Sequence, residues 1–204
     1  MTIRGDSTEY DLLEKWCKTS PWAGKEYALS CEIGVREGMS SKIILDELKP
    51  HMHMGIDPYG SKIYQHYDPG TRLEFKQPDG SRKPIKDNTD DLPVYSDDMY
   101  HQMMIDFKDY KNFQMFKMTD IDFMKKFNYL DGYCFVHFDG PHMTKDVIRE
   151  ALYFADKAAP GARFVFDDYP FYNIVKICDL LAYWDFRILE KGAMKICLEK
   201  QIQK

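Results

Sequence analysis

The sequence lacks any apolar run that approaches the roughly 20 residues of a membrane-spanning helix. Its first residues, MTIRGDSTEYDLLEKW, are polar and acidic, unlike a secretory signal peptide. It also lacks a CxxC pair, and its five cysteines are an odd number, so neither a disulfide framework nor a zinc site is predicted. Three of them, Cys31, Cys134 and Cys197, lie in apolar strand-like runs. We therefore expect a protein of the reducing cytoplasm that has no membrane partner.

An excess of positive charge is missing as well. The 204 residues include 28 Lys and Arg against 33 Asp and Glu, a net charge of −5, which gives no general attraction to nucleic acids. Hydrophobic residues make up 44% and aromatic residues 15%, too many for a disordered chain. A chain of this length can bury a full core. We expect one domain over residues 1–204 that binds a small molecule and no nucleic acid, and a homo-oligomer is left open.

Strand-like and helix-like segments alternate along most of the chain. Strands are predicted at residues 27–33, 52–56, 113–118, 133–138 and 162–166. Helices are predicted at residues 9–18, 40–48, 97–110, 120–127 and 171–183, and from Thr144 to a stop at Pro160 and Gly161. This alternation predicts an α/β fold with a doubly wound, mainly parallel sheet that helices cover on both faces. Two last strands, at residues 186–189 and 194–199, predict an antiparallel C-terminal hairpin.

Residues 59–97 differ from the rest, because they are rich in Asp, Lys, Pro and Gly and show little periodicity. A loop of this length is usually functional or mobile. We interpret it as an insertion over one face of the domain, with a short hairpin that begins near residues 73–75 and turns at Asp79 and Gly80. Its tyrosines either line an acceptor pocket or pack as a lid; they are Tyr59, Tyr64, Tyr67 and Tyr95.

Acidic residues follow every strand of the predicted parallel sheet. In chain order these are Glu32, Asp57, Asp120, Asp139 and the pair Asp167 and Asp168, and His142 stands three residues after Asp139. Ligands of doubly wound sheets bind outside the carboxyl ends of the strands, so these side chains are candidates for one site. The alternative is that they serve turns and helix caps, which also favour Asp.

The loop EIGVREGMS, from Glu32 to Ser40, is neither GxGxxG nor a phosphate-binding P-loop. Its glycines, Gly34 and Gly38, permit a tight turn and close approach of a ligand to the backbone. Glu32 suits an ammonium group better than a pyrophosphate, and Asp57 can accept hydrogen bonds from ribose hydroxyls. Together they predict S-adenosylmethionine (SAM) as the cofactor. The alternative is a glycine turn that only tightens the packing of strand and helix.

These residues resemble a known family, the class I SAM-dependent methyltransferases, and within it the metal-dependent macrolide and aminocoumarin sugar O-methyltransferases. The resemblance is carried by EIGVREGMSS, MGIDPYG and FVHFDGPHMTKDVIREALYFADKAAPGARFVFDDY, and by the closing strand pair. It extends from about residue 27 to the end, apart from the insertion.

The resemblance implies a role for each residue that matches the family pattern. Glu32, Gly34, Gly38 and Asp57 match the cofactor-binding positions, together with Ser40 at the end of the loop, and Asp120 stands where the family places a residue beside the adenine. Asp139, Asp167 and Asp168 match the carboxylates that hold a divalent cation such as Mg²⁺. His142 matches a position that some members use as general base, and Asp139 is the second expected catalytic residue. The other histidines show no spacing that demands a metal, and we expect them to be structural or exposed; they are His51, His53, His66, His101 and His137.

The expected reaction is methyl transfer to a hydroxyl of a small polyhydroxylated acceptor, such as a sugar. A hard cation on oxygen ligands would lower the pKa of the acceptor hydroxyl, and a neutral imidazole would take its proton. Two alternatives stay open. One is an N- or O-methyltransferase that uses no metal, and the other is a SAM-binding module without catalysis.

Overall fold

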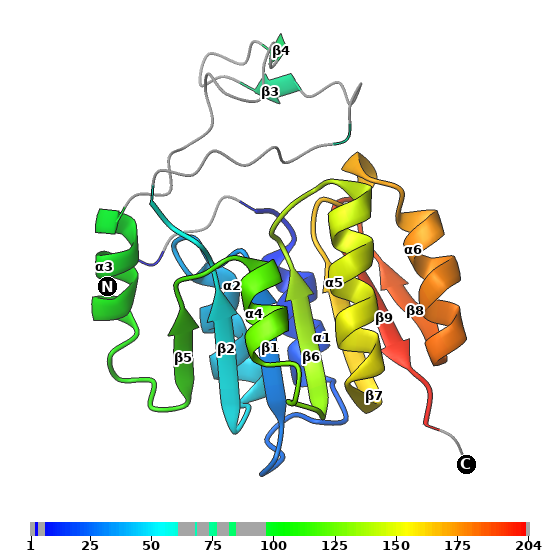
Figure 1. Cartoon of the computed structure of the whole chain (residues 1–204), viewed down its shortest axis with the longest axis horizontal. Helices are drawn as coiled ribbons and strands as arrows, with labels where there is room; N and C mark the ends of the chain where they lie inside the picture. Colours follow the sequence, from blue (N-terminus) through cyan, green and yellow to red (C-terminus); the bar gives the residue numbers. More distant parts are fainter. Residues whose placement is uncertain are drawn as a thin grey trace.

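The structure is a computed structural model that describes residues 3, 7–60, 68, 74–76, 82–84 and 97–202. A seven-stranded sheet runs through it in the order β5-β2-β1-β6-β7-β9-β8 (Figure 1). The strands are β1 (Leu29–Ile33), β2 (Met52–Ile56), β5 (Phe113–Phe116), β6 (Tyr133–Phe138), β7 (Ala158–Phe166), β8 (Phe186–Lys191) and β9 (Ile196–Lys200). The first five in this order are parallel, and β9 is antiparallel to β7 and to β8. The predicted doubly wound sheet with an antiparallel C-terminal hairpin is confirmed.

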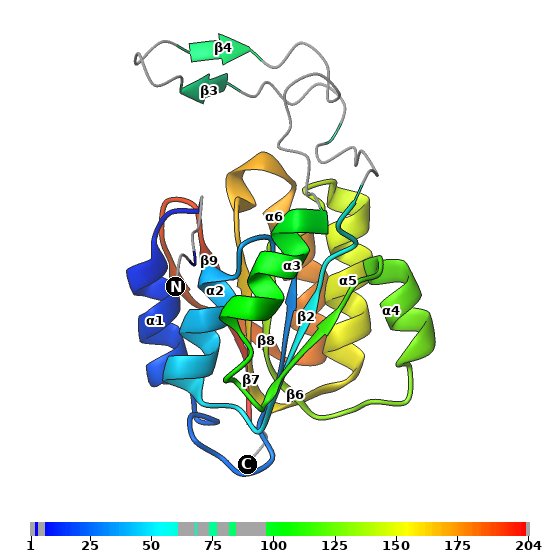
Figure 2. The same ribbon diagram turned by 90° about the vertical axis from the view of Figure 1, so that its left-hand side faces the viewer.

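Helices cover both faces of the sheet (Figures 1 and 2). One face carries α1 (Tyr10–Lys18) and α2 (Met39–Ile43), which continues into a π-helical turn, η1 (Ile44–Leu48); the other carries α4 (Asp120–Lys126), α5 (Thr144–Asp156) and α6 (Ile174–Leu181). Beside η1 packs α3 (Asp97–Asp106), through Met103 against Leu45. Among the described helices, none is long and apolar enough to cross a membrane.

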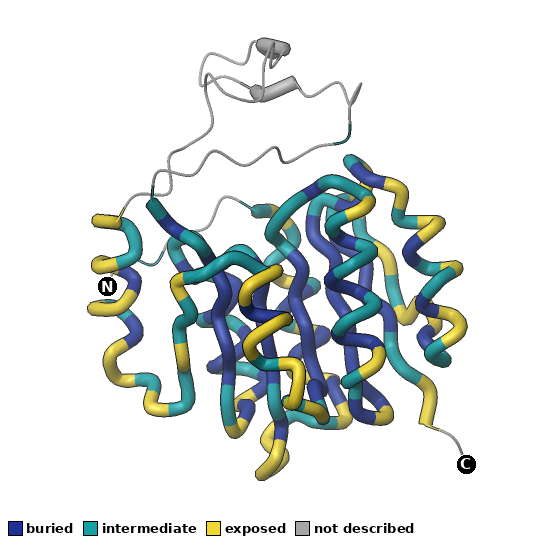
Figure 3. Tube along the Cα trace, viewed as in Figure 1, coloured by how far each residue is buried: buried dark blue, intermediate teal, exposed yellow. Residues whose placement is uncertain are grey.

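The core lies on both sides of the central strands, which are buried along their length (Figure 3). Successive side chains of a strand point to opposite faces. Phe164 and Phe166 of β7 therefore pack with Phe154 of α5, whereas Val165 packs with Trp16 of α1. Burial on both faces explains why β6 and the end of β7 are nearly continuous apolar runs.

The predicted stop of the fifth helix at Pro160 and Gly161 is wrong. The helix α5 ends at Asp156, and β7 already begins at Ala158. The pairing of β7 with β6 is irregular in this stretch, and Gly161 has a φ of +75°. Proline and glycine are tolerated in such a bulge, so here they mark an irregular strand and not a helix end.

Most of the insertion at residues 59–97 lies outside the described residues, including Tyr64, Tyr67 and Tyr95. The predicted hairpin is present as two short antiparallel strands, β3 (Glu74–Lys76) and β4 (Arg82–Pro84). Tyr59 is described, and it is buried with its hydroxyl donating to the carbonyl of Arg36. Its ring thus packs on the glycine loop.

Candidate active site

The residues that follow the parallel strands lie together at one edge of the sheet. The backbone N–H of Gly34 donates to Ile56 at the end of β2 (2.9 Å), and the N–H of Asp139 donates to Ile33 at the end of β1 (2.9 Å). The N–H of Asp167 in turn donates to Phe138 at the end of β6 (3.0 Å). The predicted convergence of these strand ends is confirmed.

The glycine loop is shaped by contacts within the protein. Gly34 has a φ of +84°, and a Cβ there would lie 2.0 Å from the carbonyl oxygen of Asp139. Gly38 has a φ of +85°, and a Cβ there would lie 2.6 Å from the Phe107 ring. From the sequence, the two glycines are expected to permit a tight turn and close approach of a ligand, or else only to tighten the packing of strand and helix. In the structure they make room for the Asp139 turn and for Phe107.

Asp57 fastens the glycine loop to the end of β2. Its carboxylate accepts three backbone N–H groups, from Val35 (3.1 Å), Arg36 (3.0 Å) and Tyr59 (3.0 Å). Burial raises the pKa of Asp57, and these hydrogen bonds offset only part of that effect. Carboxylate oxygens can accept further bonds, so the predicted contact with a ribose stays a prediction.

Glu32 is buried below the loop, in a polar network. Its carboxylate accepts from Nδ1 of His137 (2.9 Å) and from the hydroxyl of Ser41, which lies 3.1 Å from Nε2 of His53. Burial opposes ionisation, but the hydrogen bonds and charges of His137 and His53 outweigh it and bring the pKa of Glu32 to about 2. Its oxygens are thus engaged within the protein, and contact with a cofactor ammonium stays a prediction.

Ser40 and Asp120 also have partners within the protein. Ser40 is buried in the first turn of α2, where its carbonyl accepts the N–H of Ile44. Asp120 begins α4 and accepts from Arg149 of α5 (2.9 Å). Its predicted place beside an adenine therefore requires that the cofactor share Asp120 with this guanidinium.

An acidic cluster lies next to the His137 ring. One ligand atom from each of His137, Asp139 and Asp167 lies within 4.8 Å of the others, a spacing that a metal ion could bridge. Nε2 of His137 is buried and has no hydrogen-bond partner among the described residues. The family resemblance predicts Asp139, Asp167 and Asp168 in this role. Within the described part of the chain, His137 takes the place of Asp168 in the converging set.

Asp168 lies beside His142 instead. Its Oδ2 is 3.6 Å from Nε2 of His142, and Oδ1 of Asp139 is 3.9 Å from the same nitrogen. The ring stacks on Tyr172, with the ring centroids 6.1 Å apart. Burial and the nearby charge of Asp167 raise the pKa of Asp168 to about 6. The two predicted catalytic residues, Asp139 and His142, are thus brought together.

Sequence reasoning missed Lys195, whose side chain is completely buried against the cluster. Its ammonium forms an ion pair with Oδ2 of Asp167 and donates to Oγ of Ser7 (2.7 Å). Burial raises the pKa of Asp167, but Lys195 and the neighbouring donors outweigh it and leave the pKa lowered. Burial and the nearby charge of Asp167 outweigh the opposing effect of Lys195 on Asp139 and hold the pKa of that carboxyl well above its usual value.

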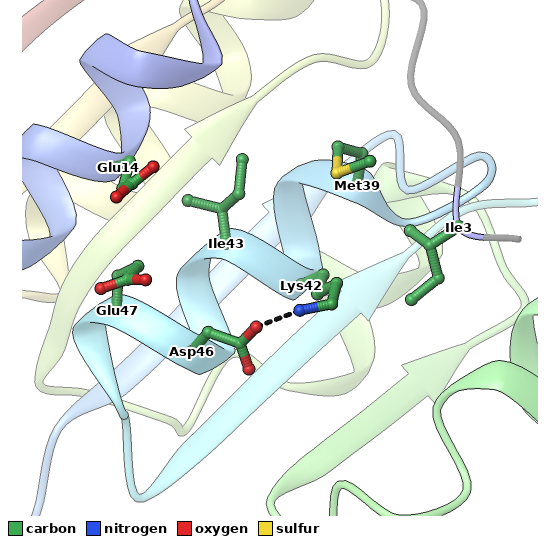
Figure 4. Close-up of a pocket in the computed structure, with 7 residues that line it drawn as sticks. All are labelled: Ile3, Glu14, Met39, Lys42, Ile43, Asp46 and Glu47. Atoms are coloured by element: carbon green, nitrogen blue, oxygen red, sulfur yellow. Dashed lines mark hydrogen bonds and ion pairs between the residues drawn. The ribbon is translucent and has the colours of Figure 1, made fainter. Parts of the chain in front are cut away.

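A surface pocket of about 350 Å³ lies elsewhere, between α1 and the α2–η1 helix (Figure 4). Its lining consists of Ile3, Glu14, Met39, Lys42, Ile43, Asp46 and Glu47, and Lys42 pairs with Asp46 one turn along the same helix. None of the predicted site residues lines this pocket. This pocket is therefore not the predicted site.

Comparison with solved structures places this architecture among methyltransferases. An O-methyltransferase from Bacillus cereus in complex with S-adenosylhomocysteine (SAH) superposes with a TM-score of 0.62 at 9% identity, covering 99% of this chain and 84% of that one. An rRNA methylase from Streptococcus thermophilus gives a TM-score of 0.57 at 8% identity, covering 98% and 100%. At such identities the likeness concerns the fold alone.

The sequence itself matches one family model, described as a methyltransferase domain, over residues 31–169. None of the curated proteins compared with the chain matches it. The matched range runs from β1 through Asp168, so it contains the glycine loop, Asp57 and the acidic cluster. It covers more than half of the chain. The chain therefore belongs to the methyltransferase-domain family and is a SAM-dependent methyltransferase.

Proposed function

We propose that the chain transfers the methyl group of SAM to a hydroxyl of a small polyhydroxylated acceptor, with His142 as the general base. The observation that carries this proposal is the position of Nε2 of His142, 3.9 Å from Asp139 and 3.6 Å from Asp168 at the strand-end edge. An imidazole titrates near neutral pH, and nearby carboxylates stabilise the imidazolium that forms when it takes a proton.

The sulfonium of SAM is already activated, so the protein has to hold the acceptor oxygen in line with the methyl carbon and remove its proton. The C–O bond then forms as the S–C bond breaks, and SAH leaves with the electron pair on sulfur. We propose that the cofactor lies against the glycine loop. Its proposed contacts there are Glu32, Gly34, Gly38, Ser40 and Asp57, with Asp120 at the adenine end. His142 would receive the hydroxyl proton.

The residues present fit the predicted Mg²⁺ in their spacing but not in their charge. The donor atoms of His137, Asp139 and Asp167 converge closely enough for a divalent cation. However, Asp167 already accepts from the Lys195 ammonium, the Ser7 hydroxyl and the N–H of Asp168. A buried ammonium inside the donor set does not fit a divalent cation, so we propose that the acceptor proton is removed without one.

The test measures SAH formation with sugar, polyol and amine acceptors, for the wild type and for His142→Gln. We expect turnover on a hydroxyl acceptor, and a loss of roughly 10²–10⁴-fold in His142→Gln with SAH affinity retained. His51→Gln changes an exposed histidine and serves as the matched control. Turnover confined to amine acceptors, or full activity of His142→Gln, would contradict the proposal.

A further inference from the structure

We infer that Lys195 supplies, from within the chain, the positive charge that the family resemblance assigns to a divalent cation, and that it positions His142 through Asp167 and Asp168. This inference rests on the proposed function for its catalytic part. The claim that Lys195 takes the place of a divalent cation concerns the folded protein alone and can be tested separately from catalysis.

The sheet register brings Lys195 to the cluster. Phe166 pairs with Ile196 in the antiparallel β7–β9 ladder, so the residues just beyond them, Asp167 and Lys195, also face each other. Both side chains are almost fully buried, at 1% and 0% exposure. Ser7 completes the contact, because its hydroxyl accepts from Lys195 (2.7 Å) and donates to Asp167 (2.5 Å).

The backbone around Lys195 is held in place. The carboxylate of Glu9 accepts the N–H groups of Ala193 (2.7 Å), Met194 (2.9 Å) and Lys195 (2.9 Å). The Lys195 ammonium also lies 5.7 Å from the centre of the Tyr10 ring, a cation–π distance. Among the described lysines, Lys195 is the one that is buried. The contacts of the fold therefore hold Lys195 in the acidic cluster.

This ammonium competes directly with a metal ion. A divalent cation bound by Asp139 and Asp167 would sit close to Lys195 in a poorly hydrated region, where like charges repel strongly. A cation bound through Oδ2 of Asp167 would also displace Lys195 from that oxygen, which would leave a buried ammonium without its partner. The acidic cluster therefore favours the Lys195 ammonium over a bound divalent cation.

A chain of contacts leads from Lys195 to the proposed base. Asp167 uses Oδ2 for Lys195 and Oδ1 to accept the N–H of Asp168 (2.9 Å). That bond supports Asp168 in a left-handed conformation, with a φ of +51°, and its carboxylate then lies 3.6 Å from Nε2 of His142. Lys195 is thus a positioning residue for His142.

The direct test titrates Mn²⁺ into the wild type, with free Mn²⁺ followed by electron paramagnetic resonance, with and without SAH. We expect no stoichiometric binding up to about 1 mM Mn²⁺, and turnover that stays within about twofold in chelator. One Mn²⁺ per chain with a Kd below about 100 µM would overturn the inference. Turnover that requires an added divalent cation would overturn it as well.

Lys195→Met removes the internal cation, and Lys200→Met is the matched control. Lys200 also belongs to the β9 region, but its ammonium donates to the carbonyls of Ala155 and Ala158, away from the cluster. We expect that Mn²⁺ raises the Tm of Lys195→Met and leaves the Tm of the wild type and of Lys200→Met unchanged. An equal response in all three proteins would refute the role of Lys195. If Lys195→Met does not fold, the double variant Asp167→Asn/Lys195→Met, which removes both charges, replaces it in the measurements of turnover. The Mn²⁺ titration of the wild type then decides whether the site binds a divalent cation.

The positioning role has its own readout. Lys195→Met should shift the pH profile of kcat, because Asp168 would no longer be held beside His142. Lys200→Met should keep the wild-type profile, and an unshifted profile in Lys195→Met would refute positioning. If the wild type shows neither SAH binding nor turnover, the proposed function fails, whereas the Mn²⁺ titration still decides whether Lys195 replaces the metal.

Discussion

Gly34→Ala tests the contact between the glycine loop and the Asp139 turn. A φ of +84° costs an alanine about 1–2 kcal/mol. In addition, the new Cβ would lie 2.0 Å from the Asp139 carbonyl oxygen, so backbone must move, which costs about 1–3 kcal/mol or more. We expect Gly34→Ala to lower the free energy of unfolding by about 2–5 kcal/mol in urea denaturation.

Gly132→Ala is the matched control for this prediction. Gly132 has nearly the same φ, +86°, but nothing lies within 4 Å of a Cβ built there. Gly132→Ala should lower the free energy of unfolding only by the conformational cost of a positive φ, about 1–2 kcal/mol. Equal losses in the two variants would show that the loop does not contact the Asp139 turn as described.

Two further substitutions test the groups that hold the site. Glu32→Gln removes a carboxylate whose pKa is lowered to about 2, so its stabilisation is complete above the unfolded pKa of about 4.5 and is lost as the pH falls towards 2. The stability difference between the wild type and Glu32→Gln should therefore shrink by about 2 kcal/mol from pH 7 to pH 3 in urea titrations, and a constant difference would contradict this pKa. Glu9→Ala removes the acceptor of three backbone N–H groups and should cost about 1–2 kcal/mol, measured by thermal unfolding. Glu14→Ala, which loses only an exposed pair with Lys18, should cost under about 0.5 kcal/mol, and equal costs would refute the role of Glu9.

The parts of the fold that sequence reasoning predicted best are those with local signals. The strands at residues 52–56 and 133–138 match β2 and β6, because each is an apolar run with clear turn residues at its end. The start of β7 was predicted too late, because Pro160 and Gly161 suggested a helix end. Whether such a pair ends a helix or lies in a bulge depends on the pairing of β7 with β6, which the local sequence does not specify.

The candidate site also contains residues that the local sequence predicts and residues that it does not. Acids at parallel strand ends must gather at one edge, so Asp57, Asp139 and Asp167 could be predicted from the strand pattern. His137 also carried a signal, because it stands two residues before Asp139 and shares its face of the strand. Lys195 carried none, since its contact with Asp167 depends on the register of an antiparallel pair between segments about 30 residues apart in the chain.

Calorimetric titration of the wild type with SAH in chelator tests the central claim most directly, namely that the strand-end edge binds the methyl donor. We expect one SAH per chain with a Kd of about 1–100 µM, the same affinity when Mg²⁺ replaces the chelator, and binding at least about tenfold weaker in Asp57→Ala. An absence of binding at about 1 mM SAH, or full affinity in Asp57→Ala, would contradict the account.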